Sequence, residues 1–575
     1  MFFLAEAIAG RDGSVSDRTV DAVSARWLHG PFWDIFLGCG LLYALLFVAL
    51  GLIGPGITTS VSLGALAVGA IATGAPHYGA TLLRVYEQRE DRRKYALLAV
   101  WFSGLLVFLF GVSLYWHALG IFFVSLYFIW NPWHYSGQNY GLAMMFLRRR
   151  GIEVTPVARR FFYASFVLSA FLAVVAMNAP RPASAQETAA GAKLIAPFFH
   201  FEPIGLPAPL MTTLLSLGLI AYVTSLVIAV VSLLRKSTLA DILPSLLLVA
   251  TQSLWFVLPV ATRYWGLLQD FLPFDAQHVE YTFLFIAIGH SVQYLWVTSY
   301  FASRTKNYRS HFRFWLSCVL AGSALWHVPP LFLGGIALGT AAYTEGLAML
   351  VATFVNLHHF VLDGAIWKLR DGPIARILLR ESKDTGEAGE RPPAIGTREK
   401  RHWGRLLVNA LGTLGVSVAL ISWWENEFGF VWASQQGDEV RMQVAVERLE
   451  LIGRPNGNYH RHLAQVARSK KDPGRALAEL DSSLAVRDHP KSHFLKGHIY
   501  REQNDWGAAA DAYERAYAID PKPALLIYRL SQALIHVGRL NEADEILRKG
   551  LKLHPGNRPL QDQVRALKRA RTGAG

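Results

Sequence analysis

The chain has 575 residues, of which 52% are apolar, and its mean hydropathy is +0.27. This is too apolar for a soluble protein of this length, and several stretches reach the roughly 20 apolar residues that cross a bilayer. The net charge is +14, but the cations gather in short loops between apolar stretches, which is typical of a membrane protein and disfavours nucleic-acid binding. Only two cysteines are present, which excludes a disulfide framework and a cysteine-rich zinc site.

After a short polar segment, residues 1–33, the apolar stretches predict a bundle of about eleven membrane-spanning helices over residues 34–424. The fourth helix contains Asn131 and Pro132, and a proline inside a helix should kink it. The predicted spans cover residues 34–54, 59–83, 95–115, 117–147, 160–179, 209–233, 239–260, 279–301, 313–335, 342–367 and 403–424.

Basic residues alternate between the two sides of these spans. The loops after the second and fourth spans carry clusters at 89–94 and 148–150, whereas the opposite loops contain only Arg181, Lys193 and Arg263. Loops rich in Lys and Arg stay in the cytoplasm, so the N-terminus is predicted to be cytoplasmic. Because the predicted number of spans is odd, the tail is predicted to lie outside the cytoplasm. The sequence therefore predicts a multi-pass protein of a bacterial-type inner membrane, embedded in the lipid bilayer.

The tail is polar and repetitive, and it follows a predicted linker at residues 425–457. The series Ala509, Tyr513, Ala516, Pro521 recurs after 34 residues as Ala543, Leu547, Gly550, Pro555. This pattern resembles the tetratricopeptide repeat (TPR) family. The resemblance implies an α-solenoid domain at 458–575, and its concave surface is expected to dock a protein or peptide partner. Together with the helical bundle, this predicts an all-α fold. A purely structural cap is the alternative.

Five histidines lie deep inside the predicted spans: His77, His134, His290, His358 and His359. At 1.5 Å per helical residue, each lies about 10–21 Å from the first cation of the adjoining cytoplasmic loop, so four helices place imidazoles at similar depths. Ionisable groups inside a membrane are costly and are kept mainly for function. We therefore expect these histidines to converge around one polar site.

A metal ion is the predicted occupant of that site, because imidazole is the commonest protein metal ligand. Asp363 follows His359 by four residues, so it lies on the same helical face and can bind the ion or orient a ligand. Gln138 and Gln293, each about one turn after a histidine, are predicted to hydrogen-bond the second ring nitrogens. Several imidazoles and one carboxylate suit iron, with copper or zinc as alternatives.

The set of histidines in apolar helices, which includes the adjacent pair His358 and His359, resembles the integral-membrane histidine-cluster oxygenases, hydroxylases and desaturases. Those families carry HxxxH and HxxHH boxes, whereas this chain distributes its histidines mostly one per helix. The resemblance implies a metal-dependent enzyme that oxidises a lipid or another apolar substrate. Three alternatives remain open: a transporter or assembly scaffold with proton-relaying histidines, an envelope glycosyltransferase with a repeat tail, and a bis-histidine haem protein. In the tail, His489, His493 and His498 mimic ligand spacing but are predicted to lie on a solvated helical face.

Overall fold

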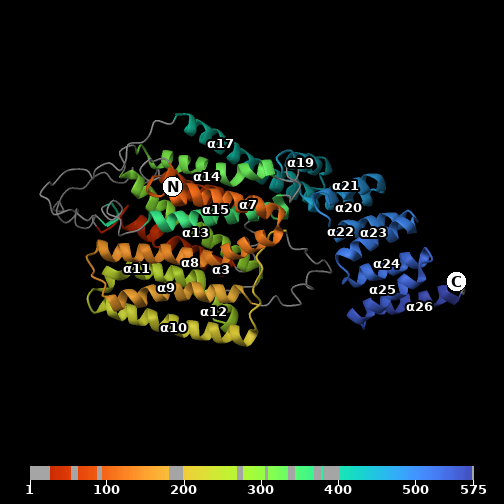
Figure 1. Cartoon of the computed structure of the whole chain (residues 1–575), viewed down its shortest axis with the longest axis horizontal. Helices are drawn as coiled ribbons and strands as arrows, with labels where there is room; N and C mark the ends of the chain where they lie inside the picture. Colours follow the sequence, from red (N-terminus) through yellow and green to blue (C-terminus); the bar gives the residue numbers. More distant parts are fainter. Residues whose placement is uncertain are drawn as a thin grey trace. The chain divides into compact units, whose positions relative to one another are not determined.

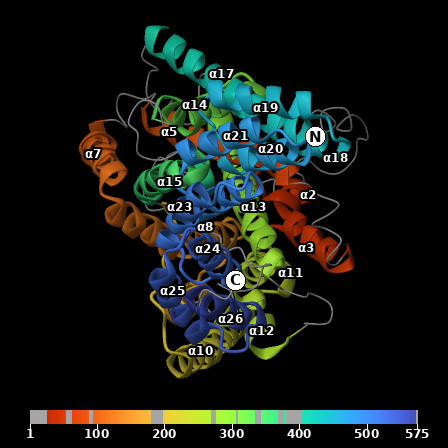
Figure 2. The same cartoon turned by 90° about the vertical axis from the view of Figure 1, so that its right-hand side faces the viewer.

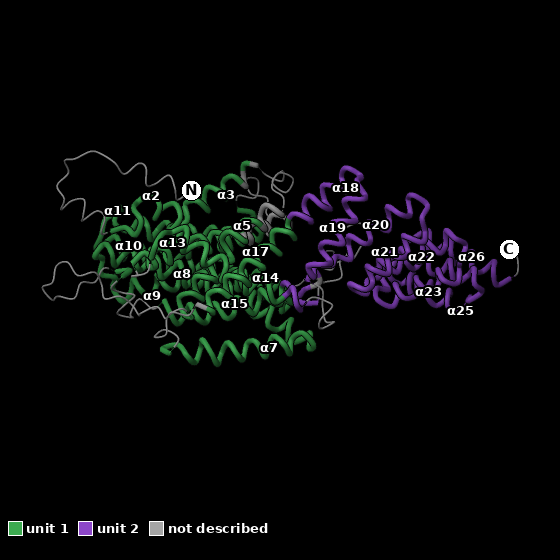
Figure 3. The backbone as a smooth tube through the Cα atoms, turned by 90° about the horizontal axis from the view of Figure 1, so that it is seen from above, with its two compact units in different colours: residues 1–180, 200–329, 349–423 green, residues 181–199, 330–348, 424–575 purple. Residues whose placement is uncertain are grey.

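A computed structural model of the chain describes residues 26–53, 63–86, 93–179, 198–267, 276–304, 308–333, 343–367, 377–379 and 402–572. All regular structure within these ranges is helical, as the predicted all-α fold requires. The chain divides into two compact units (Figure 3). The first contains residues 1–180, 200–329 and 349–423, and the second contains residues 181–199, 330–348 and 424–575.

The first unit is a bundle of long helices, in which α8, α9, α10 and α11 run side by side (Figure 1). Its helices are α2 (Pro31–Trp33), η2 (Asp34–Gly38), α3 (Leu41–Ile53), α5 (Leu63–Tyr86), η4 (Leu97–Phe102), α7 (Ser103–Tyr115), α8 (His117–Arg149), α9 (Pro156–Met177), α10 (Ala208–Leu234), α11 (Leu239–Gln252), η6 (Ser253–Val257), α12 (Leu258–Trp265), α13 (Ala276–Ser303), α14 (His311–Leu333), α15 (Leu347–Ile366) and α17 (His402–Trp424). Helix α8 continues through Pro132 as one helix.

Seven helices in the described residues are long and apolar enough to cross a membrane, or eight if the bent pair Pro31–Gly38 and Leu41–Ala49 forms one span. Three further predicted spans, α5, α8 and α13, form helices of 24, 33 and 28 residues, but they are less apolar than those seven. The predicted bundle of about eleven spans is therefore not confirmed. These three helices carry His77, His134 and His290 beside other buried polar side chains, which lowers their hydropathy.

Helix α15 is the most enclosed of the candidate spans. Buried residues make up 72% of its most apolar window, against 22% for Leu97–Tyr115. Close backbone contact between α5 and α14 fixes the neighbouring helices, because a side chain at Gly79 would collide with the carbonyl group of Cys318, and one at Gly322 with that of Ala75. Small residues at such crossings are typical of helix packing in membranes.

The second unit contains paired helices that stack in chain order (Figures 1 and 2). Its elements are η7 (Tyr343–Glu345), η8 (Glu425–Val431), α18 (Trp432–Gln436), α19 (Glu439–Leu451), α20 (Gly457–Ser469), α21 (Pro473–Val486), α22 (Pro490–Glu502), α23 (Trp506–Ile519), α24 (Ala524–His536), α25 (Leu540–Leu553) and α26 (Arg558–Thr572). The pairs are α20–α21, α22–α23 and α24–α25, and α26 packs on the last pair. The predicted linker 425–457 is itself helical, because η8, α18 and α19 occupy most of it.

Small residues stand where paired helices touch. A side chain at Gly497 on α22 would collide with the ring of Tyr513 on α23, and one at Gly550 on α25 would collide with Ile527 on α24. Ser531 takes the corresponding small position on α24 and is completely buried. Ser531 follows Gly497 by 34 residues, and Gly550 follows Ala516 by 34 residues. A small residue therefore recurs at each of these two positions after one repeat length.

The second unit is larger than the predicted repeat domain, because it includes segments from the earlier part of the chain. The guanidinium of Arg454 lies 4.1 Å from the ring centroid of Tyr343, and that of Arg487 lies 4.8 Å from the ring centroid of Phe198. Thr344 donates a hydrogen bond of 3.0 Å to the carbonyl oxygen of Pro455. Two segments that come before the repeats in sequence thus pack against the first repeat helices.

Candidate metal centre

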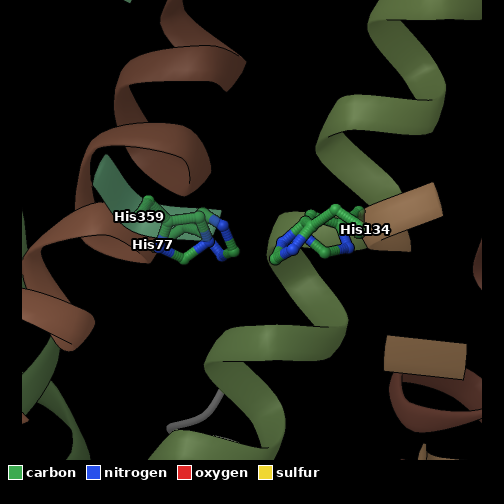
Figure 4. A group of neighbouring side chains, drawn as sticks. His77, His134 and His359 are labelled. Carbon is green, nitrogen blue, oxygen red and sulfur yellow. The ribbon is translucent and has the colours of Figure 1, made fainter. Parts of the chain in front are cut away.

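Four of the predicted histidines converge inside the bundle. His77 on α5, His134 on α8, His290 on α13 and His359 on α15 each offer one ring nitrogen, and these nitrogens all lie within 4.8 Å of one another. Figure 4 shows the rings of His77 and His359 directed toward His134. Four separate helices therefore contribute one imidazole each to a single centre.

The ring nitrogens of these imidazoles are only partly satisfied by hydrogen bonds. Among the described residues, the buried side-chain atoms without a hydrogen-bond partner include Nδ1 of His77, Nε2 of His134, Nε2 of His359 and both ring nitrogens of His290. Leaving a buried donor or acceptor unpaired costs about 1–3 kcal/mol. Protein interiors avoid such costs, so a cluster of unpaired nitrogens indicates a site built for a ligand.

His359 is held by a hydrogen-bonded chain that leads to Asp363. Its Nδ1 lies 3.0 Å from Oγ1 of Thr81, and Thr81 donates to Oδ1 of Asp363 at 2.8 Å. The Tyr294 hydroxyl donates to the same carboxylate oxygen at 2.8 Å, and Trp367 Nε1 donates to that hydroxyl at 3.0 Å. If Nδ1 of His359 carries the proton, Nε2 keeps its lone pair free for an ion, and this is how proteins orient imidazole ligands.

Asp363 lies beside the four-histidine group and is not a member of it. Its Oδ2 is 3.4 Å from Nε2 of His359, while Oδ1 accepts the two hydrogen bonds from Thr81 and Tyr294. The structure thus favours Asp363 as the group that orients His359. Lys368 and Arg370, the cations that follow Asp363 in the sequence, lie outside the described ranges.

Aromatic rings enclose the four imidazoles. Tyr135 stacks on His290 with 4.0 Å between ring centroids, and Phe360 stacks on His134 at 4.2 Å. The ring of Tyr294 lies 4.3 Å from that of His77. This packing restricts the rotamers of the imidazoles and places apolar ring surface against three of them.

His358 lies apart from the group, although it was predicted to join it. Its Nε2 lies 2.8 Å from the Ser103 hydroxyl and 3.2 Å from the Tyr86 hydroxyl. Adjacent residues on a helix point about 100° apart, so His358 and His359 cannot both face the same centre. His358 instead joins α15 to α7 and α5 by ordinary hydrogen bonds.

The two predicted glutamine partners lie near the centre but bond to other groups. Gln138 Nε2 donates to the backbone carbonyl of His290 and to Oε1 of Gln293, both at 3.3 Å. Gln293 Nε2 donates to the carbonyl oxygen of Gly38 at 3.2 Å. They fix α8, α13 and η2 relative to one another, and no hydrogen bond from either glutamine to a ring nitrogen is found in the described part of the chain.

The partners that sequence reasoning missed are Thr81, Tyr294 and Trp367. Each follows a singled-out residue by four positions, namely His77, His290 and Asp363. Residues four apart share a helical face, so the rule that drew attention to Asp363 also identifies these three. Their polar groups complete the network around His359.

The donor set fits one transition-metal ion. Four points within 4.8 Å of one another leave a common centre no more than about 3 Å from each, compared with about 2.0–2.1 Å for a zinc–imidazole bond. Small side-chain adjustments therefore suffice to bind an ion. Imidazole ligands suit iron, copper and zinc.

The three histidines of the repeat unit differ from the predicted solvated face. His493 is buried and its Nε2 lies 2.6 Å from Oδ1 of Asp488. His489 caps α22 by accepting a hydrogen bond of 3.1 Å from the backbone nitrogen of Lys491. His498 is partly buried. Their sequence spacing reflects helix capping and helix packing.

Comparison with known protein families found one match, to a family described as tetratricopeptide repeat, over residues 500–568. No curated protein and no solved structure matches the chain. The matched residues run from the end of α22 into α26, so this part of the second unit consists of tetratricopeptide repeats. Such repeats dock other proteins.

Proposed function

We propose that this protein is an integral-membrane metalloprotein whose centre of His77, His134, His290 and His359 oxidises a lipid or another apolar substrate. The observation that carries the proposal is the convergence of four imidazoles from four helices, three of them buried and that of His134 partly buried, with ring nitrogens that lack hydrogen-bond partners among the described residues. Such an arrangement costs free energy unless a ligand satisfies it. Perturbed, unpaired ionisable groups that gather in one place mark a functional site.

Exposed apolar side chains on the first unit support a location inside the bilayer. The candidate span Leu97–Tyr115 exposes large apolar side chains, including Leu97 (72% exposed), Val107 (71%) and Phe108 (66%). Exposed apolar surface of this kind marks contact with a partner or with lipid. An apolar substrate dissolved in the bilayer would then reach the centre without crossing water.

Iron is the ion that we expect, with copper and zinc as the alternatives. A bound ion of this kind supplies redox or Lewis-acid chemistry. The chain's own groups hold and orient the ligands. Asp363 and Thr81 fix the tautomer of His359, and the Tyr294 hydroxyl donates a hydrogen bond to Oδ1 of Asp363. The aromatic rings beside the cluster keep water away.

The product test compares lipids extracted from cells that express the wild type, His134→Gln or His358→Gln. Mass spectrometry should reveal species that have gained oxygen or lost two hydrogens in the wild type and in His358→Gln. The same species should be absent with His134→Gln. His358→Gln is the matched control, because it changes a partly buried histidine outside the centre. Identical lipid profiles for all three would refute an oxidising enzyme of lipids.

A transporter with histidines as a proton relay is the second candidate. It is favoured by the contact of His77 with His359, at 4.3 Å between ring centroids, and by the link from His359 to Asp363. Such a relay works without a metal, so proton-coupled uptake by metal-free protein in vesicles would favour it. An envelope glycosyltransferase would use acidic residues in its first outer loop, but the sequence of that predicted loop, residues 54–60, contains none.

We also propose the orientation that the loop charges predict, with a cytoplasmic N-terminus and an extracytoplasmic repeat unit in a bacterial-type inner membrane. Reporter fusions after Gly575 test it. A reporter active only outside the cytoplasm should work there, and a cytoplasmic reporter should not. The opposite result would mean that the number of crossings is even.

A further inference from the structure

Helix α17 turns an amide side chain outward from the first unit. The helix belongs to one of the candidate membrane spans, and Asn409 is exposed on it. The backbone oxygen of Asn409 accepts a hydrogen bond of 2.8 Å from the Thr413 hydroxyl, but no partner of its side-chain amide is found among the described residues. The amide is therefore able to bond to a group outside the unit.

The depth of Asn409 makes an unbonded amide costly. It follows Arg405 by four residues, which places it about 6 Å further along the helix axis. Its side chain is short, so it cannot reach back to the headgroups as a lysine or arginine does. A polar group that faces acyl chains without a hydrogen bond costs free energy. A membrane-embedded α17 therefore needs a hydrogen-bonding partner at this position.

The inner face of α17 is already used within the unit. Helix α17 lies at the edge of the first unit and packs on α14 (Figure 1). A side chain at Gly412 would collide with the backbone of Leu320, and one at Gly415 with that of Ser323. The close contact leaves no space for a further helix on that side, whereas the outer face stays exposed.

The outer face beside Asn409 has small side chains at its centre. Leu406, Ala410, Thr413, Ser417 and Leu420 are all exposed, and they follow one another at intervals of 4, 3, 4 and 3 residues. Contact positions in a pair of parallel helices have this spacing. Small residues in the middle of such a series let two helix backbones approach closely, as helix pairs in membranes do.

Helix α10 presents a different outer face. Its exposed side chains include Leu217, Ile220, Val227 and Val231, which are as apolar as the acyl chains of a lipid. On α17, three successive contact positions are instead Ala, Thr and Ser, with the Asn409 amide next to them. Lipid is therefore a suitable neighbour for α10, and another helix is a suitable neighbour for α17.

We propose that α17 pairs with α17 of a second copy of this chain, with the two Asn409 amides hydrogen-bonded to each other across a two-fold axis. An amide is both donor and acceptor, so it is its own complement. Two copies inserted in the same orientation place Asn409 at the same depth, and a two-fold axis along the membrane normal brings identical residues face to face. The inference rests on the membrane location proposed above and does not depend on the metal centre.

Energy transfer between two differently labelled batches of the full-length protein, mixed in lipid vesicles, measures the association. Transfer should fall as lipid is added, and the dilution curve should fit a dimer. Asn409→Leu should weaken association about tenfold, because it removes the hydrogen bonds between the helices. Asn409→Gln keeps an amide and should restore most of the affinity.

Two threonines give a matched pair of variants. Thr413→Leu should also weaken association about tenfold, because a larger side chain keeps the two backbones apart. Thr213→Leu is the control, since Thr213 is exposed on α10 and its hydroxyl donates to a backbone oxygen one turn earlier at 2.9 Å, as that of Thr413 does at 2.8 Å. It should leave association unchanged.

Disulfide formation in membranes, with copper–phenanthroline as the oxidant, locates the contact. Thr413→Cys should give a covalent dimer, whereas Leu217→Cys should not. The wild type should also stay monomeric in this assay, because Cys39 and Cys318 are buried.

A monomer at every lipid dilution, full association of Asn409→Leu, or a disulfide at position 217 and none at position 413 would overturn the proposal. Metal content separates this inference from the proposed function. Asn409→Leu should hold as much metal as the wild type, so a monomer that keeps its metal would refute the dimer alone, and a dimer without metal would refute the metal centre alone.

Discussion

Two buried histidines, one in each unit, show how differently the same side chain is used. His460 in the repeat unit is 4% exposed, and both its ring nitrogens are occupied, Nδ1 by Glu479 at 2.8 Å and Nε2 by Glu450 at 2.9 Å. His290 in the bundle is 2% exposed, and neither of its ring nitrogens has a hydrogen-bond partner in the part of the chain that the structure describes. Equal burial therefore comes with opposite degrees of hydrogen bonding.

The difference separates a structural histidine from a ligand. His460 joins α20 to α19 and α21 through two carboxylates, so its contribution is to the packing of the repeats. His290 joins nothing through its ring nitrogens, yet three other imidazoles lie within ligand distance. A buried polar group without partners is retained for some purpose other than stability. The following changes test this contrast.

Metal removal should have the largest effect, and only on the bundle. An ion present at about 1,000 times its Kd stabilises the folded protein by about 4 kcal/mol. Chelation should therefore lower the thermal unfolding transition of the first unit, while hydrogen exchange in α20–α25 stays unchanged. Equal changes in both units, or none in the bundle, would erase the proposed contrast.

His460→Ala should have the next largest effect, and only on the repeat unit. It leaves Glu479 and Glu450 without their shared partner, and removing one member of a buried ion pair costs about 3 kcal/mol or more. Hydrogen exchange of α20 and α21 should accelerate, while the metal content of the bundle is unchanged. Leu463→Ala, a buried apolar position on the same helix, measures how much of the loss is simple packing.

The same histidine should make repeat stability depend on pH. Burial lowers the pKa of His460, but the hydrogen bonds and charges of Glu479 and Glu450 outweigh it, so its pKa lies above the ordinary 6.5. A raised folded-state pKa stabilises the fold fully below 6.5, and this stability is lost as the pH rises through the folded value. Protection factors of α20, that is, exchange rates corrected for the intrinsic pH dependence of amide exchange, should fall over that window in the wild type but not in His460→Ala. Stability that rises with pH there would contradict the assignment.

Asp363→Asn should weaken metal binding about 10- to 100-fold, which is the usual cost of losing a group that orients a ligand. Asn has the same shape and still accepts hydrogen bonds from Thr81 and Tyr294, so the fold should persist. Titration of the metal-free protein with ferrous ion measures the affinity. An unchanged Kd would remove Asp363 from the centre and leave it a role in joining α5, α13 and α15.

His358→Gln should have the smallest effect. It alters hydrogen bonds to Ser103 and Tyr86, and one such bond contributes about 0.5–1.5 kcal/mol. Metal binding should be unaffected, whereas His359→Gln, one position further on, should abolish it. A loss of metal in both variants would mean that the ion sits nearer to α7 than the four-histidine group indicates.

The convergence of four histidines was predictable from the sequence, because the helical rise gives each of them a similar distance to the end of its apolar stretch. This brought together the histidines on α5, α8, α13 and α15. The sequence does not show which face each helix turns toward its neighbours. Within one helix, however, adjacent residues never share a face. That rule alone separates His358 from His359.

The partners of each ligand depend on contacts between helices, which the sequence of one helix does not reveal. Gln138 lies one turn from His134 yet bonds to Gln293 on another helix. The repeats were predictable because their packing is local, with each helix pair repeating after 34 residues. The addition of Tyr343 and Phe198 to the repeat unit was not, since nothing in their local sequence indicates a contact more than a hundred residues away.

The central claim is that the four histidines hold a metal ion, and elemental analysis of the purified full-length protein tests it most directly. After expression with iron, copper and zinc supplied, the wild type and His358→Gln should each retain about one transition-metal ion per chain. His290→Gln should retain less than about a tenth of that amount while still folding. A wild type without metal, or a His290→Gln variant with as much metal as the wild type, would contradict the account.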